Sequence, residues 1–279
     1  MPDPSTDRAD ATVSPEGPSG GRPEALPPLV LLPGMQCTRE LFAPFVAALL
    51  GHRPGTRISV RPVTEATHVR AVGAAVAGFD RPVILVGHSL GGTVALAAAR
   101  LRPDRVAGVV TLCANPRAPR ADQIQAWQVR RARVTDPEPG ADADPPVELL
   151  IGPARDAASP SRHRVAARLC RRMADATGAA RLGRQLTLQL ERVDERPGLA
   201  RFTGPVLAVG AEDDLLVPPE RSREIAAAAP RGAVRILPRA THMAPLLAPD
   251  LVAATVTTWL EREFGQPGES PTARHACRT

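Results

Sequence analysis

The chain has 279 residues, a formal net charge of +6 and 43% hydrophobic residues, which suits one large α/β domain with a sizeable core. No apolar run approaches the roughly 20 residues of a membrane span, and the N-terminus lacks the pattern of a secretory signal. The basic residues are all arginine and follow no nucleic-acid-binding motif. We therefore expect a cytoplasmic protein that acts on neither a membrane nor a nucleic acid.

The four cysteines are Cys37, Cys113, Cys170 and Cys277, scattered without the spacing of a metal site. We interpret them as reduced thiols, because disulfides are rare in the cytosol. The sequence gives no reason to expect a metal or another cofactor.

The two ends of the chain differ in composition from the rest. Residues 1–27 are rich in proline, glycine, serine and acidic residues and contain few large apolar side chains. Such a segment cannot bury enough surface to order itself, so we predict a disordered tail. Residues 265–279 have a similar composition and are predicted to form a flexible C-terminal tail.

Between the tails, short apolar runs alternate with helical patterns, which predicts a parallel sheet with right-handed crossovers. The runs are continuous rather than alternating, as strands buried on both faces usually are. Predicted strands cover residues 28–32, 57–63, 83–86, 106–113, 205–209 and 233–237. Predicted helices cover residues 38–50, 69–79, 90–100, 219–229 and 249–264. These elements define a core of residues 28–114 and 202–264.

The alternation stops between residues 115 and 201. Helices are predicted there over 120–134, 161–176 and 180–193, with a loop over 136–146 that is rich in proline, glycine and aspartate. An insertion between two parallel strands is expected above their carboxyl ends, where open α/β sheets bind ligands. We therefore predict a helical cap domain over residues 115–201.

The cap is more basic than the rest of the chain. Residues 117–201 hold 16 arginines against 11 acidic residues. A basic cap could steer an acidic carrier protein or a coenzyme A thioester toward the site. Coding bias, concentrated in a segment that packing constrains little, is the alternative explanation.

One motif indicates catalysis. The apolar run at residues 83–86 leads into Gly87-His88-Ser89-Leu90-Gly91, and a small, apolar helical pattern follows at once. A strand, a sharp turn and a helix in this order expose the serine hydroxyl at the apex, with glycines where side chains would clash. We predict that Ser89 is a nucleophile.

A serine hydroxyl needs a base within hydrogen-bond reach and a group that orients the base. In a parallel sheet these belong in loops after later strands. The loop at residues 210–218 offers Glu212, Asp213 and Asp214, and the loop at residues 238–245 offers His242. The chain order of serine, acid and histidine matches that of a nucleophile-elbow enzyme.

With these motifs, residues 28–264 resemble the α/β-hydrolase superfamily. The resemblance implies an α/β fold, mostly a parallel sheet flanked by helices with a helical cap. It also implies that the acid is Asp214, four residues before Pro218, and that His242 is the base. The implied oxyanion hole uses the backbone N–H groups of Met35 and Leu90. Residues 1–27 show no sign of the family's usual N-terminal strand hairpin, so we expect about six parallel strands.

A serine at the elbow indicates acyl chemistry, since relatives that open epoxides or displace halide carry aspartate there. We predict hydrolysis of a small or medium carboxylic ester or thioester through an acyl-enzyme. A non-hydrolytic enzyme on the same fold, catalysing elimination, acyl transfer, cyclisation or lyase chemistry in small-molecule biosynthesis, is the alternative. A ligand-binding receptor that retains the triad without catalysing a reaction is a third hypothesis.

Overall fold

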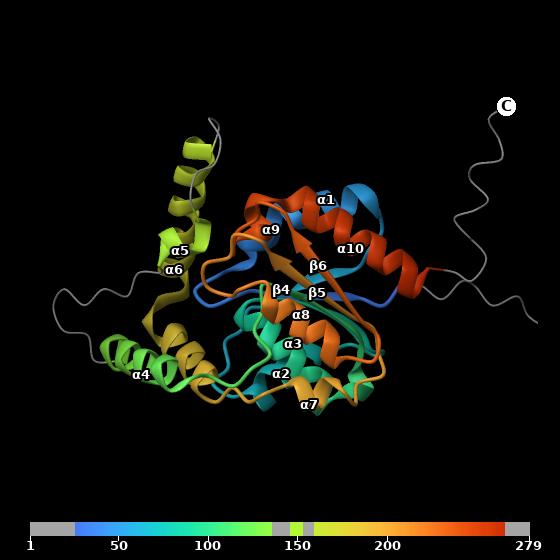
Figure 1. Cartoon of the computed structure of the whole chain (residues 1–279), viewed down its shortest axis with the longest axis horizontal. Coiled ribbons are helices and arrows are strands. Elements are labelled where there is room, and N and C mark those ends of the chain that lie inside the picture. Colours follow the sequence, from blue (N-terminus) through green and yellow to red (C-terminus); the bar gives the residue numbers. More distant parts are fainter. Residues whose placement is uncertain (1–25, 136–145, 153–158, 266–279) are drawn as a thin grey trace, which may run out of the picture.

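The computed structural model describes residues 26–135, 146–152 and 159–265, and Figure 1 shows their arrangement. Six strands form one sheet in the order β2-β1-β3-β4-β5-β6, and every pairing in it is parallel. The strands are β1 (Leu29–Leu32), β2 (Ile58–Val60), β3 (Val83–His88), β4 (Val106–Leu112), β5 (Val206–Ala211) and β6 (Gly232–Leu237). No strand precedes β1 among the described residues. The predicted α/β fold with six parallel strands is confirmed.

Two layers of helices cover the sheet. The helices of the core are α1 (Ala43–His52), α2 (His68–Val76), α3 (Leu90–Leu101), α8 (Glu220–Ala228), α9 (Ala244–Leu247) and α10 (Pro249–Phe264). The short helix α7 (Arg196–Leu199) lies within the range predicted as cap but packs against α3 and α8. In Figure 1, α1 and α10 lie on one face of the sheet, and α2, α3 and α8 lie on the other. None of the described helices is both long and apolar enough to cross a bilayer.

The strands supply side chains to two hydrophobic cores. Successive side chains of a strand point to opposite faces, and in β1 Leu29 and Leu31 join the core under α1 and α10. Val30 and Leu32 join the core under α2 and α3. This division explains why the inner strands β1, β3 and β5 are continuous apolar runs, because both of their faces are buried, whereas the edge strand β6 is partly exposed.

The cap lies between β4 and β5, at one end of the sheet (Figure 1). It contains α4 (Ala121–Thr135), α5 (Val147–Ile151) and α6 (Ser159–Leu190), with α4 and α5 both packed against α6. The two helices predicted over 161–176 and 180–193 form this one element, which is kinked at Gly178, where φ is 70° and ψ is 163°. The prediction of two helices is correct, since the non-helical backbone of Gly178 lies between the two predicted segments and makes the bend.

Several predicted boundaries need correction. The segment predicted as one helix over 38–50 begins as a 3-10 turn, η1 (Arg39–Phe42), capped by the Thr38 side chain, before α1 starts. The helices α5, α7 and α9, of 5, 4 and 4 residues, were not predicted. Such short helices complete barely one turn, so they leave no periodic pattern. Most of the predicted tails and of the loop at 136–146 lie outside the described residues.

Candidate active site

The candidate residues all follow the carboxyl ends of strands. Ser89 comes directly after β3, Asp214 three residues after β5, and His242 five residues after β6. Parallel strands end at the same edge of a sheet, so side chains distant in sequence meet there. The structure brings Ser89 and His242 to the wall of one cavity, with Met35 from the loop after β1.

Ser89 has a strained backbone at the apex of a sharp turn. Its φ of 50° and ψ of −114° lie outside the regions that side-chain-bearing residues prefer. It is the N-cap of α3, and its own N–H donates to the Leu112 carbonyl at 2.9 Å. Strain of this kind persists only where the surroundings fix it, and here the neighbouring strand does so. The turn holds the hydroxyl in the cavity wall.

Glycines permit the turn for a steric reason. A Cβ at Gly91 would lie 2.0 Å from the Leu32 carbonyl oxygen, and one at Gly87 would lie 2.3 Å from the Gly91 oxygen. Both obstacles are backbone atoms, which cannot swing aside as a side chain can. The spacing of glycines on either side of Ser89 therefore reflects close packing of β1, β3 and α3.

His242 and Asp214 form a buried, hydrogen-bonded pair. His242 Nδ1 donates to Asp214 Oδ2 at 2.8 Å, and the side chains are 3% and 0% exposed. Since the carboxylate can only accept, Nδ1 carries the proton and Nε2 is the ring nitrogen left to act as a base. No hydrogen bond joins Ser89 to this ring among the described residues, although both line the cavity.

Two backbone donors hold the other carboxylate oxygen. Asp214 Oδ1 accepts from the N–H groups of Leu216 at 2.9 Å and Val217 at 2.8 Å. Burial favours the neutral acid, but the hydrogen bond and charge of His242, with these two donors, outweigh it and hold the Asp214 pKa below its usual value. Asp214 is therefore an anion at neutral pH.

The two other acidic residues of this loop form hydrogen bonds that differ from those of Asp214. Glu212 is turned outward and accepts from the Arg239 N–H at 2.8 Å. The Asp213 N–H donates to the Ala240 carbonyl at 2.8 Å, which ties the two loops together. The structure thus places Asp214, rather than either neighbour, against the histidine.

His88 connects the serine turn to the histidine loop. Its Nε2 donates to the backbone oxygen of His242 at 2.9 Å, and the two rings lie 5.0 Å apart. The side chain is 1% exposed, and Nδ1 is buried without a partner. Burial, helped by the charge of His242, lowers the His88 pKa to about 3, so the ring is neutral. Its position indicates a structural role.

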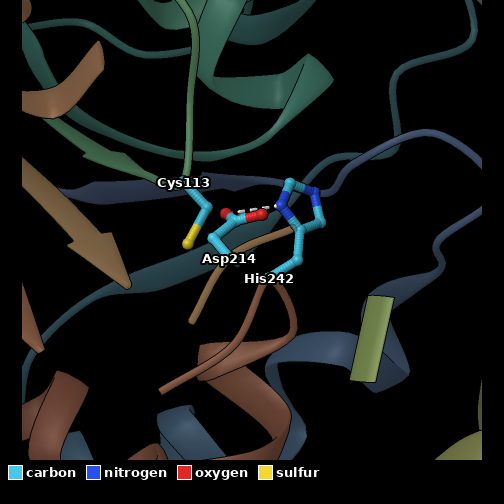
Figure 2. A group of neighbouring side chains, drawn as sticks. All are labelled: Cys113, Asp214 and His242. Carbon is cyan, nitrogen blue, oxygen red and sulfur yellow. Dashed lines mark hydrogen bonds and ion pairs between the residues drawn. The ribbon is translucent and has the colours of Figure 1, made fainter. Parts of the chain in front are cut away.

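Cys113 lies behind the acid. Figure 2 shows the Asp214 carboxylate between the Cys113 side chain and the His242 ring. One potential ligand atom from each of these residues lies within 4.8 Å of the others, a spacing that a metal ion could bridge. Burial and the adjacent Asp214 charge, however, raise the Cys113 pKa well above its usual value, and a protonated thiol is a poor metal ligand. The cluster is better explained as a hydrogen-bonded group.

Of the two predicted oxyanion donors, Leu90 directly follows Ser89, and Met35 lines the same cavity as Ser89. Leu90 opens α3, so its N–H has no partner within the helix. Met35 lies in the turn after β1, and none of the described backbone groups accepts from its N–H. The next residue, Gln36, has a φ of 54°, and its N–H donates to the Gln185 side chain of the cap at 3.0 Å. Cap and turn are therefore joined at this point.

The cavity has a volume of about 320 Å³, within the range of small-molecule sites. Of the candidate residues, Met35, Ser89 and His242 line it, and the cap contributes residues of α4, of α5 and of the end of α6. The cap side chains in its wall are Asp122, Gln123, Ala126, Trp127, Arg130, Pro146, Leu150, Gln189 and Arg192. The space is therefore bounded by both parts of the chain.

Sequence reasoning missed several of these residues. Cys113 could have been found, because it is the last residue of the strand predicted over 106–113 and so lies at the same edge of the sheet. Gln36, Arg130 and Arg192 carry no sequence signal, since their place depends on how the cap packs. Cys37 and Cys170 are buried free thiols within the core, whereas Cys277 lies outside the described residues.

Comparison with known proteins identifies relatives of this chain in sequence and in fold. The chain is 29% identical over 164 residues to RutD of Pseudomonas savastanoi pv. phaseolicola, whose name describes a carbamate hydrolase. That match spans 59% of this chain and 62% of the length of RutD.

Two solved structures share the fold. An esterase from Thermogutta terrifontis, solved with malate bound, has a TM-score of 0.74 and 22% identity, covering 86% of this chain and 90% of its own. An enol-lactonase from Burkholderia xenovorans LB400 has a TM-score of 0.70 and 21% identity, covering 86% and 94%. The sequence profile of the alpha/beta hydrolase family matches residues 29–255. The chain is an enzyme of hydrolase type and belongs to the alpha/beta hydrolase family.

Proposed function

We propose that this enzyme is a serine hydrolase that cleaves a small or medium carboxylic ester or thioester through an acyl-enzyme. One observation carries the proposal: His242 is held by Asp214 at 2.8 Å with Nε2 unoccupied, in the wall of the cavity that also holds Ser89. This arrangement supplies a nucleophile, a base and an orienting anion.

In the proposed reaction, Ser89 Oγ forms a bond to the acyl carbon while His242 Nε2 takes the hydroxyl proton. The negative charge of the tetrahedral intermediate is stabilised by the N–H groups of Met35 and Leu90. The intermediate collapses, and His242 returns the proton to the departing alcohol or thiol. Water then attacks the acyl-enzyme with the same base, which releases the acid and restores Ser89. Asp214 stabilises the imidazolium at each stage.

The first experiment labels the protein with a fluorophosphonate probe and assays p-nitrophenyl esters of increasing acyl length. Ser89→Ala should lose both labelling and turnover, because no other hydroxyl replaces the nucleophile. Ser161→Ala is the matched control, since this serine is exposed on α6 and bonds only Arg164 among its described contacts. It should retain both properties.

The same measurements separate hydrolysis from the other chemistries of the fold. Labelling of Ser89 without turnover of any ester or thioester would indicate a site that excludes water from the acyl-enzyme. Absence of labelling at Ser89, in protein that is folded by circular dichroism, would refute the acyl-enzyme mechanism.

A further inference from the structure

Arg192 is a buried arginine in the wall of the cavity. It follows the end of α6 and is 6% exposed. Its Nε donates to the Arg117 carbonyl at 2.9 Å, and its Nη1 donates to the Gln189 side chain at 2.9 Å. Nη2 is buried and has no hydrogen-bond partner among the described residues. Of the five N–H donors of an arginine, the pair on Nη2 and one on Nη1 are unused.

No carboxylate neutralises this guanidinium among the described residues. The acidic residues that follow it in sequence bind other arginines: Asp194 pairs with Arg196 at 2.6 Å, and Glu195 pairs with Arg100 at 2.7 Å. A buried charge without a partner is costly, so proteins rarely keep one unless it has a use.

The charge persists and affects its surroundings. Burial lowers the Arg192 pKa to about 10, which leaves the group protonated at neutral pH. Burial lowers the pKa of the nearby His68 to about 4, with the charges of Arg100 and Arg192 contributing. The Trp127 ring lies over the guanidinium, with 5.4 Å between Cζ and the ring centroid. The Arg192 guanidinium in the cavity wall therefore carries a positive charge that forms no ion pair with a described carboxylate.

A structural role explains only part of this arrangement. The bond to the Arg117 carbonyl ties the end of α6 to the segment after β4, and this requires a donor rather than a charge. A neutral side chain could serve as that donor without the desolvation cost of a cation. The unused N–H donors of Arg192 and its position in the cavity wall are instead explained by a bound ligand.

We propose that Arg192 binds a carboxylate group of the substrate. This inference rests on the proposed function: the ester or thioester cleaved at Ser89 would carry an anionic carboxylate at the end that enters the cap. A planar guanidinium matches a carboxylate with two parallel hydrogen bonds. The cavity volume of about 320 Å³ limits the substrate to a short dicarboxylic half-ester or a molecule of similar size.

The test compares pairs of substrates that differ only in charge. The p-nitrophenyl half-esters of succinate, glutarate and adipate are each assayed beside the same compound with its free carboxylate capped as a methyl ester. One charged bond of this kind is worth roughly 10- to 100-fold in affinity. The wild-type enzyme should therefore prefer one charged half-ester over its methyl ester by about that factor in kcat/KM. Equal rates at every chain length would overturn the inference.

Substitutions test whether Arg192 causes the preference for the charged half-ester. Arg192→Met should bring the charged-to-capped ratio close to one, and Arg192→Lys should restore part of it because the charge is kept. Arg168→Met removes the same charge from an exposed position on α6 outside the cavity and should leave the ratio unchanged. If Arg192→Met does not fold, the wild-type ratio and the lysine variant still decide the question.

A binding measurement separates this inference from the proposed function. Isothermal titration with the free dicarboxylate of the preferred length should show binding to the wild type, weakened about 10-fold or more in Arg192→Met. That result without fluorophosphonate labelling of Ser89 would leave the anion site standing and refute the acyl-enzyme. Labelling of Ser89 without carboxylate binding would support the acyl-enzyme and refute the anion site at Arg192. Binding of inorganic phosphate in preference to every dicarboxylate would also overturn the carboxylate assignment.

Discussion

Acid should destabilise this enzyme through His88, and the size of the effect follows from its burial. The His88 pKa is lowered from 6.5 to about 3 in the folded state. At pH 5 the unfolded chain therefore binds a proton that the folded protein does not. Stability is fully present above pH 6.5 and is lost as the pH falls toward 3. Between pH 7.5 and 5 this single group removes about 2 kcal/mol of unfolding free energy.

The assay is urea unfolding, followed by circular dichroism at pH 7.5 and pH 5. His68, whose pKa is lowered to about 4, contributes a similar amount, so the wild type should lose about 4 kcal/mol from these two groups. His88→Gln keeps an amide donor for the His242 carbonyl but cannot titrate. Its loss on acidification should be smaller than that of the wild type by about 2 kcal/mol.

The control is His52→Gln, a change at an exposed histidine that ends α1. It should lose as much stability as the wild type over the same pH interval. If His88→Gln also lost as much as the wild type, the reasoning that burial keeps His88 neutral would be wrong.

Two further predictions concern the acid and the serine turn. Asp214→Asn should lower kcat by roughly 10²- to 10⁴-fold, because the amide cannot stabilise an imidazolium, whereas Glu212→Gln, an outward residue, should stay within a few-fold. An unchanged kcat in Asp214→Asn would remove this residue from the mechanism. Gly91→Ala should lower the free energy of unfolding by about 2 kcal/mol or more, since its Cβ would meet the Leu32 carbonyl at 2.0 Å. Gly51→Ala, where no atom lies within 4 Å, should instead raise it by up to about 1 kcal/mol; similar melting curves for the two variants would contradict the steric argument.

The sheet could be predicted because its physical requirements are visible in the sequence. Strands covered on both faces must be apolar throughout, and residues such as Leu29 and Val30 serve opposite cores while adjacent in the chain. The choice of Asp214 also has a local reason that the structure supplies. Its Oδ1 accepts hydrogen bonds from the backbone N–H groups of residues 216 and 217. The next residue is a proline, which has no N–H and cannot donate. The four-residue spacing between Asp214 and Pro218 therefore matches the turn in which the backbone holds the Asp214 carboxylate.

The cap could be predicted in kind but not in shape. The break between the helices predicted over 161–176 and 180–193 falls at Gly178, but the pattern does not give the angle between the two segments of α6. The placement of Arg192 depends on where α6 ends relative to the segment after β4, which is a matter of tertiary packing. Nothing in a run of arginines distinguishes the buried one from those exposed to water.

The bond from His88 to the His242 carbonyl links residues 154 positions apart in the chain. It fastens the loop of the proposed base to the turn of the proposed nucleophile, so thermal motion of one loop carries the other with it. The entropic cost of bringing these groups together then arises during folding and not in each catalytic cycle. Mutations that loosen this tether should therefore slow turnover even when every reacting group remains in place.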